Sequence, residues 1–158
     1  NELRVNGNDL YAFVDLTIGF RASVLDPAMM INGSSLQFSS GGAMLSWMDD
    51  GLYNNGNFIL SKVSDASLAD LGEMQAEFSM SDTVNATNIS DSTSFSPQNE
   101  IWITNNILVW AIDSTDSAVL SAFEQRFSQT IVPIPEPTTI YLLGLSFLCL
   151  GFSRLRRS

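Results

Sequence analysis

The chain of 158 residues contains no histidine and only one cysteine, Cys149. The lack of histidine excludes Ser-His-Asp triads and histidine-ligated zinc sites. A single cysteine cannot form an internal disulfide, so the fold must be stable without one. Chemistry is left to carboxylates and hydroxyls, and none of them lies in a motif that singles it out. We therefore expect no catalytic residue, no cofactor and no metal.

Basic residues are also scarce, and they are unevenly placed. Residues 1–131 contain four Lys and Arg against sixteen Asp and Glu, a formal charge of −12. Residues 132–158 contain three arginines and one glutamate. Because an acidic body repels phosphate backbones instead of neutralising them, we expect no nucleic-acid partner.

The chain has no apolar run of the roughly 20 residues that span a bilayer comfortably. Residues 140–152 form a shorter stretch of thirteen uncharged residues. The chain also begins without methionine and without the basic-then-apolar stretch of a secretory signal peptide. We interpret this beginning as the result of leader removal or of fragmentation. Hydrophobic residues still make up 45% of the chain, enough to bury a core at this length.

The pattern of residues 1–131 is mostly that of β structure. Residues 10–20 alternate apolar and polar positions, as a strand with one buried face does. Tyr11 and Phe13 interrupt the polar side and indicate cover on both faces there. Further strands are predicted at 35–39, 43–49, 58–63 and 73–81, and turn dipeptides at Asp50-Gly51 and Asn55-Gly56.

The second half of the body predicts three more features. Residues 81–98 are nearly all Ser, Thr, Asn and Asp, which predicts a long, mobile, solvated loop. Residues 99–112 predict a central hairpin that turns at Asn105-Asn106. Within 113–129, the spacing of Leu120, Phe123 and Phe127 predicts a short amphipathic helix. The expected fold is therefore mainly β: an antiparallel β-sandwich-like domain with a short C-terminal helix.

Two groups of residues in the body are candidates for a site. Clustered oxygens of the kind that hard cations require are offered by Asp49, Asp50, Asn54, Asn55 and Asn57. The EF-hand spacing fails there, so we favour a hairpin turn. Aromatic side chains that could stack on sugar rings are Tyr11, Trp47, Tyr53, Trp102 and Trp110. For all of these except Tyr53 we favour packing in the core.

The last 27 residues have three parts. In VPIPEPTT, residues 132–139, three prolines favour an extended segment that is poor in backbone donors, a geometry that suits a protease. Residues 140–152 predict a short transmembrane helix, and residues 153–158 form a basic tail. The arginines of that tail, kept in the cytoplasm, would orient the segment with its N-terminal side outside; they are Arg154, Arg156 and Arg157.

This tail resembles the PEP-CTERM sorting signal of Gram-negative bacteria. The name-giving motif is matched by Pro135, Glu136 and Pro137, and Thr138 and Thr139 stand where the family usually has Ser or Thr. The apolar stretch and the arginine cluster follow in order. The resemblance implies recognition by exosortase, a membrane cysteine protease or transpeptidase, during a transient stay in the inner membrane. It also implies that the body is then released or attached to the cell surface or its polysaccharide matrix.

Other C-terminal signals fit less well. A plain membrane anchor has no need of Glu136 between prolines, or of so short a span. A sortase signal requires Leu-Pro-x-Thr-Gly, which is absent, and a GPI signal would end in its apolar tail. We therefore expect an exported surface or extracellular-matrix protein with a non-enzymatic extracellular body at 1–131. The alternative is a secreted polysaccharide-acting enzyme, or a carbohydrate-binding module, on the same signal.

Overall fold

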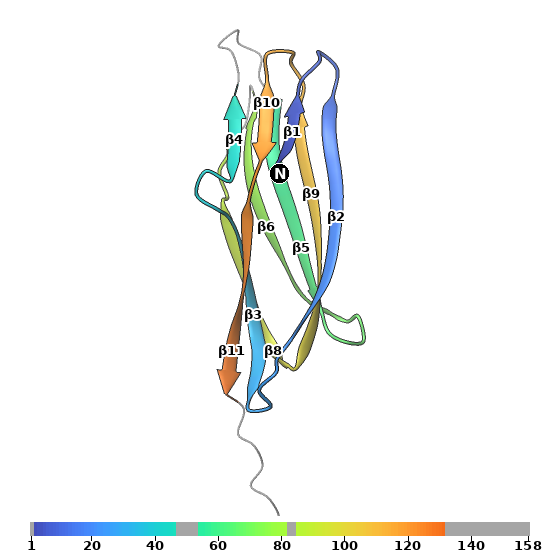
Figure 1. Cartoon of the computed structure of the whole chain (residues 1–158), viewed down its shortest axis with the longest axis vertical. Coiled ribbons are helices and arrows are strands. Elements are labelled where there is room, and N and C mark those ends of the chain that lie inside the picture. Colours follow the sequence, from blue (N-terminus) through green and yellow to red (C-terminus); the bar gives the residue numbers. More distant parts are fainter. Residues whose placement is uncertain (1, 47–53, 82–84, 132–158) are drawn as a thin grey trace, which may run out of the picture.

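The computed structural model describes residues 2–46, 54–81 and 85–131. Within these ranges the regular secondary structure consists of β-strands alone. The strands pair antiparallel in three sheets, which form two facing layers (Figure 1). The expected mainly β, sandwich-like class is confirmed. The stalk, the short transmembrane helix and the basic tail expected at 132–158 lie outside the described residues. In the described part of the chain, no helix is long and apolar enough to cross a membrane.

One layer is a five-stranded sheet with the order β2-β9-β5-β6-β7. Its strands are β2 (Ala12–Ser23), β9 (Glu100–Ala111), β5 (Asn54–Ser64), β6 (Asp70–Ser81) and β7 (Asn85–Ala86). Every second residue of β9 is buried, among them Ile103 and Ile107, and the residues between them face outward. This alternation follows from the pleat, which sends successive side chains to opposite faces.

The other layer is divided into two three-stranded sheets that lie end to end along the length of the five-stranded sheet (Figure 1). The first contains β1 (Leu3–Asn6), β10 (Ser117–Leu120) and β4 (Ala43–Ser46). The second contains β11 (Phe123–Ile131), β3 (Met29–Phe38) and β8 (Ser90–Gln98). Where the two sheets meet, the backbone at Gly42 lies close to the backbone at Ala122: a Cβ on Gly42 would lie 2.1 Å from the carbonyl oxygen of Ala122. Glycine at position 42 makes this close passage possible.

The hydrophobic core lies between the two layers. Ile59, Ile107 and Val109 enter it from the five-stranded sheet, and Leu36 and Ala118 enter it from the other layer. All five are at most 2% exposed. Each fully buried Val, Leu or Ile side chain contributes about 1.5 to 3 kcal/mol by leaving water, so the contact between layers is the main source of stability.

The hairpin predicted over 99–112 is wrong, because β9 runs through it as one strand. Asn105 and Asn106 lie in its middle, in register with Ser61 and Leu60 of β5. Asn105 is buried and Asn106 faces the outer side, as neighbours in a strand do. The central position predicted for this segment is confirmed, since β9 pairs with β2 on one side and β5 on the other.

The short amphipathic helix predicted within 113–129 is also wrong. That segment contains β10 and β11, and β11 pairs with β3 along its whole length. Phe123 and Phe127 are four residues apart, which places them on one face of a helix but equally on one face of a strand. Pairing with β3, a contact distant in sequence, decided between the two.

The loop predicted over 81–98 contains strands instead. β7 pairs with β6, and β8 pairs with β3, while residues 82–84 are not among those described. Polar side chains attach this segment to β6: the backbone N–H of Gln75 donates to Asp91 Oδ2 at 3.0 Å, and Asn88 Nδ2 donates to the backbone oxygen of Gln75 at 3.0 Å. Phe95 of β8 also packs against the hydrophobic core.

The turn expected at Asn55-Gly56 is likewise wrong, because both residues lie inside β5. The turn expected at Asp50-Gly51 falls on residues outside the described ranges. The strand expected at 58–63 forms as part of β5, and the strand expected at 73–81 forms as part of β6.

Candidate functional site

Three aromatic side chains gather on the outer face of the five-stranded sheet, where β2 begins. The rings of Tyr11 and Phe13 are tilted by 34° with their centroids 5.4 Å apart. Phe13 is the register partner of Trp110 on β9, so their side chains share a face. Tyr11 is 49% exposed and Phe13 55% exposed. The cover expected on both faces at the start of this strand is therefore wrong, and these rings are open to solvent.

Trp110 is held in place by two residues of β5. Its Nε1 donates a hydrogen bond to Asn54 Oδ1 at 3.2 Å. Its ring lies over Gly56, its register partner, where a Cβ would be 2.4 Å from the indole Cζ2 and Cη2 atoms. Only glycine leaves room for the indole to lie flat on the sheet. A ring fixed in this way loses little further conformational freedom when a ligand stacks on it.

Asn54 is itself anchored by the neighbouring backbone. Its N–H donates to Asp116 Oδ2 at 2.9 Å, and its carbonyl oxygen accepts from the N–H of Ile112 at 3.1 Å. Asn54, the partner of the indole, is therefore positioned by the residue that follows β9 and by the residue that precedes β10. The aromatic group thus rests on rigid strands, which hold a binding surface more accurately than a loop does.

Polar groups follow the aromatic group along the same face. Asp15 is exposed beside Phe13 on β2, and Thr17 Oγ1 donates to Asn106 Oδ1 at 2.9 Å. Such side chains can exchange hydrogen bonds with hydroxyl groups of a ligand. We call the surface formed by Tyr11, Phe13, Asp15, Thr17, Asn106 and Trp110 the aromatic face.

A second aromatic position lies at the far end of β9. Trp102 is 41% exposed, and the guanidinium carbon of Arg21 lies 5.9 Å from the centre of its ring. Arg21 also forms an ion pair with Glu100, with 3.4 Å between Nη1 and Oε2. Trp102 and Trp110 are eight residues apart in one strand, which is about 26 Å. Core packing, our interpretation for both tryptophans, does not hold, since both project from the outer face.

Many residues singled out in the sequence lie outside the described ranges. They are Trp47, Asp49, Asp50, Tyr53, Pro135, Glu136, Pro137, Thr138, Thr139, Arg154, Arg156 and Arg157. The structure therefore does not bring them into relation with the aromatic face. The position of the sorting motif stays an expectation from the sequence.

The asparagines considered for calcium are used for other contacts. Asn55 is buried, and its Nδ2 donates to the backbone oxygens of Ser46 at 3.0 Å and Ser117 at 3.2 Å. Asn54 points the other way, toward Trp110. Neighbours in a strand face opposite sides of the sheet, so they do not direct their oxygens at one point. Among the described residues, no group of three or more His, Cys, Asp or Glu could hold a metal ion.

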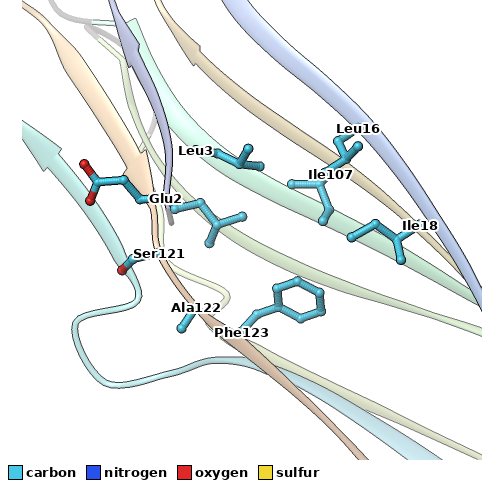
Figure 2. Close-up of a pocket in the computed structure, with 9 residues that line it drawn as sticks. Glu2, Leu3, Leu16, Ile18, Ile107, Ser121, Ala122 and Phe123 are labelled. Carbon is cyan, nitrogen blue, oxygen red and sulfur yellow. The ribbon is translucent and has the colours of Figure 1, made fainter.

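An apolar groove opens at one side of the sandwich, beside the start of β1 (Figure 2). Its volume is about 450 Å³, and its floor includes Leu16, Ile18 and Ile107 of the five-stranded sheet. Leu3 and Phe123 border it from the other layer. Leu16 and Ile18 are each 38% exposed, although both point toward the interior. The sequence pattern places these two on a buried face and does not reveal that the covering layer is incomplete there.

Two carboxylates in turns have lowered pKa values. The backbone N–H of Ser114 donates to Asp9 Oδ1 at 2.8 Å and is the main reason that the pKa of Asp9 is lowered. The hydroxyl of Ser67, followed by the N–H of Ala69, lowers the pKa of Asp65. A general acid that is protonated at neutral pH requires the opposite shift. These two groups therefore stabilise turns and are unsuited to acid catalysis.

Comparison with known proteins places the chain in no family. No protein-family model matches the sequence, and no curated protein matches it either. Among solved structures, TmCBM61 in complex with β-1,4-galactotriose aligns with 76% of this chain and 66% of its own at 15% identity, with a TM-score of 0.34. A structure from the Gx strain of infectious bursal disease virus aligns with 92% of this chain and 47% of its own at 12% identity, with a TM-score of 0.20. The chain thus spans less than two thirds of either structure, and likeness at this level carries no argument about ligands.

Proposed function

We propose that the body at 1–131 is a non-enzymatic module that binds extracellular polysaccharide through the aromatic face. The protein would be an exported bacterial surface or matrix protein, delivered by exosortase acting on Pro135-Glu136-Pro137. The observation that carries the binding proposal is the exposure of Tyr11 and Phe13 beside the fixed ring of Trp110. Sequence alone supports the delivery step.

Aromatic side chains suit sugars because a pyranose ring has apolar C–H faces bordered by hydroxyl groups. An aromatic ring covers such a face, and nearby polar side chains bind the hydroxyls. On the aromatic face, Phe13 and Tyr11 supply the exposed rings, and Asp15, Thr17 and Asn106 supply the polar groups. An exposed apolar group bordered by polar residues is a recognised sign of a binding surface.

The charge of the body indicates which polysaccharides fit. With a formal charge of −12 over 1–131, the body repels polyanions. Asp15 adds a carboxylate next to Phe13, so a uronic acid stacked there would meet like charge. We therefore propose neutral or amino-sugar polymers as ligands in preference to acidic ones.

The test is to titrate the full chain with soluble neutral, cationic and anionic polysaccharides and to follow binding by calorimetry. Phe13→Ala should cost about 1 to 2 kcal/mol, as truncation of an energetically important interface side chain does, which is roughly a 5- to 30-fold rise in Kd. Leu25→Ala is the matched control, because Leu25 is apolar and 96% exposed but lies in the connection between β2 and β3. The proposal fails if no polysaccharide binds, or if Phe13→Ala and Leu25→Ala bind equally well.

A further inference from the structure

The two sides of the sandwich are closed to different extents. On one side, Asn88 and Asp91 bond to the backbone of β6 and connect the layers. On the other side, β1 pairs with β10 only as far as Leu3, the partner of Leu120. Among the described residues, no strand pairs with the outer edge of β11, which continues from that point. An unpaired edge beside an apolar groove is a site where another strand can add.

The exposed part of β11 has a symmetric sequence. Residues 123–127 read Phe-Glu-Gln-Arg-Phe, with an aromatic residue at each end and opposite charges on either side of a central glutamine. Phe123, Gln125 and Phe127 point toward the interior, where Phe127 packs edge-on against Phe20 at 6.4 Å between centroids. Glu124 and Arg126 project from the outer face and are 43% and 68% exposed.

We propose that a second copy of this chain pairs antiparallel with β11, about a two-fold axis at Gln125, to form a symmetric dimer. This register sets Glu124 opposite Arg126 of the second copy, and the symmetry repeats the pair. It also sets Phe123 beside Phe127 of the second copy on the inner face. Directly opposed residues on one face of an antiparallel pair interact, and opposite charges there are favourable while like charges are not. An isologous contact of this kind closes on itself and leaves no free β11 edge.

The geometry of β11 limits how many residues can pair with the second copy. The pairing of β11 with β3 shifts register between Ser128 and Gln129, and such an irregularity bends a strand. Residues 123–127 lie before this irregularity, so the proposed paired segment stays within the regular part of β11. Phe127 of the second copy comes to lie beside Phe123, at the border of the apolar groove.

Charge complementarity favours a second copy over an unrelated peptide. Within one chain, Arg126 Nε already donates to Glu124 Oε2 at 3.0 Å. Each chain gives up one such pair and the dimer forms two, so the number of ion pairs is unchanged; since an exposed ion pair contributes at most about 1 kcal/mol, this exchange costs little. A strand of arbitrary sequence would have no residues matched to this order of charges.

The experiment measures the mass of the full chain by sedimentation equilibrium over a concentration series. In Glu124→Arg, the new arginine of each copy faces Arg126 of the other copy. In Arg126→Glu, the new glutamate of each copy faces Glu124 of the other copy. Each single variant should therefore remain monomeric under conditions in which the unchanged chain dimerises. An equimolar mixture of the two variants should form a heterodimer, because each positive residue then meets a negative one.

The mixture separates pairing between chains from stability within one chain, since neither variant regains its internal ion pair on mixing. Lys62→Glu is the matched control: it breaks the exposed Lys62–Glu73 pair on β5 and β6 and should leave dimerisation unchanged. A chain that is monomeric throughout, or single variants that dimerise like the unchanged chain, would overturn the proposal. Failure of the mixture to associate would overturn it as well.

Discussion

Asn105 of β9 and Gln125 of β11 are joined across the interior of the sandwich, with Asn105 Nδ2 donating to Gln125 Oε1 at 2.9 Å. Gln125 Nε2 in turn donates to Ser61 Oγ at 3.0 Å and to Ser34 Oγ at 3.3 Å. A central strand of one layer is thereby tied to the edge strand of the other. Polar groups buried in this way are stabilising only as long as their partners are present.

We expect Asn105→Ala to lower the free energy of unfolding by about 1 to 3 kcal/mol, because it leaves the inward-facing carboxamide oxygen of Gln125 without this donor. Asn106→Ala is the matched control. Asn106 accepts a hydrogen bond from Thr17 on the outer face, where water can replace it, so the loss should be under about 1 kcal/mol. Urea denaturation of both variants measures the difference. Equal losses would contradict the buried role of Asn105.

Gly56→Ala should displace the ring of Trp110. The new Cβ would lie 2.4 Å from two indole carbons and 2.6 Å from Ser79 Cβ, so the ring must leave the sheet. We expect a stability loss of about 1 to 3 kcal/mol, as for other overpacked sites, together with a changed near-ultraviolet circular dichroism spectrum. Gly41→Ala changes a glycine with open space around it but with φ of 69°, so any loss there reflects backbone strain alone. An unchanged aromatic spectrum in Gly56→Ala would argue against the fixed ring.

The pH dependence of stability should include a contribution from Asp65. Its pKa in the folded chain is lowered from 3.8 by the hydroxyl of Ser67 and the N–H of Ala69. The ionised form is therefore favoured by folding, and its stabilisation is present above the unfolded value and lost as pH falls through the folded one. The stability difference between the unchanged chain and Asp65→Asn should be constant at higher pH and shrink below pH 3.8. A difference that grows on acidification would contradict this.

In a host with exosortase, Glu136→Ala should block processing while membrane insertion persists. A charge outside the bilayer core contributes little to insertion, whereas an enzyme can recognise it. Mass spectrometry and fractionation of both proteins measure the outcome. Release of equal amounts of mature protein from both, or an unprocessed original chain, would contradict the role proposed for the motif.

Alternation in the sequence was enough to predict strands where one face is apolar and the other is not. β2, β5 and β6 were found in this way, since Leu16, Ile59 and Met74 mark an inner face at every second residue. The same pattern does not reveal which faces are covered. Tyr11 and Phe13 are exposed because the described layers lie on the other side of their strand, and that depends on the arrangement of whole sheets.

The sequence alone was enough to exclude histidine-dependent sites, to argue against a nucleic-acid partner and to predict export. These inferences depend on the absence of histidine, the acidic body and the order of motifs in 132–158, which are local properties of the chain. The tertiary structure decided the rest. A spacing of four is compatible with a helix or a strand, so only pairing with β3 made Phe123 and Phe127 part of β11. Asn105 has the local preferences of a turn residue, but the hydrogen bond to Gln125, twenty residues away, places it in the core. The free energy that stabilises these positions comes from contacts between residues distant in sequence. Local propensity contains no information about such contacts.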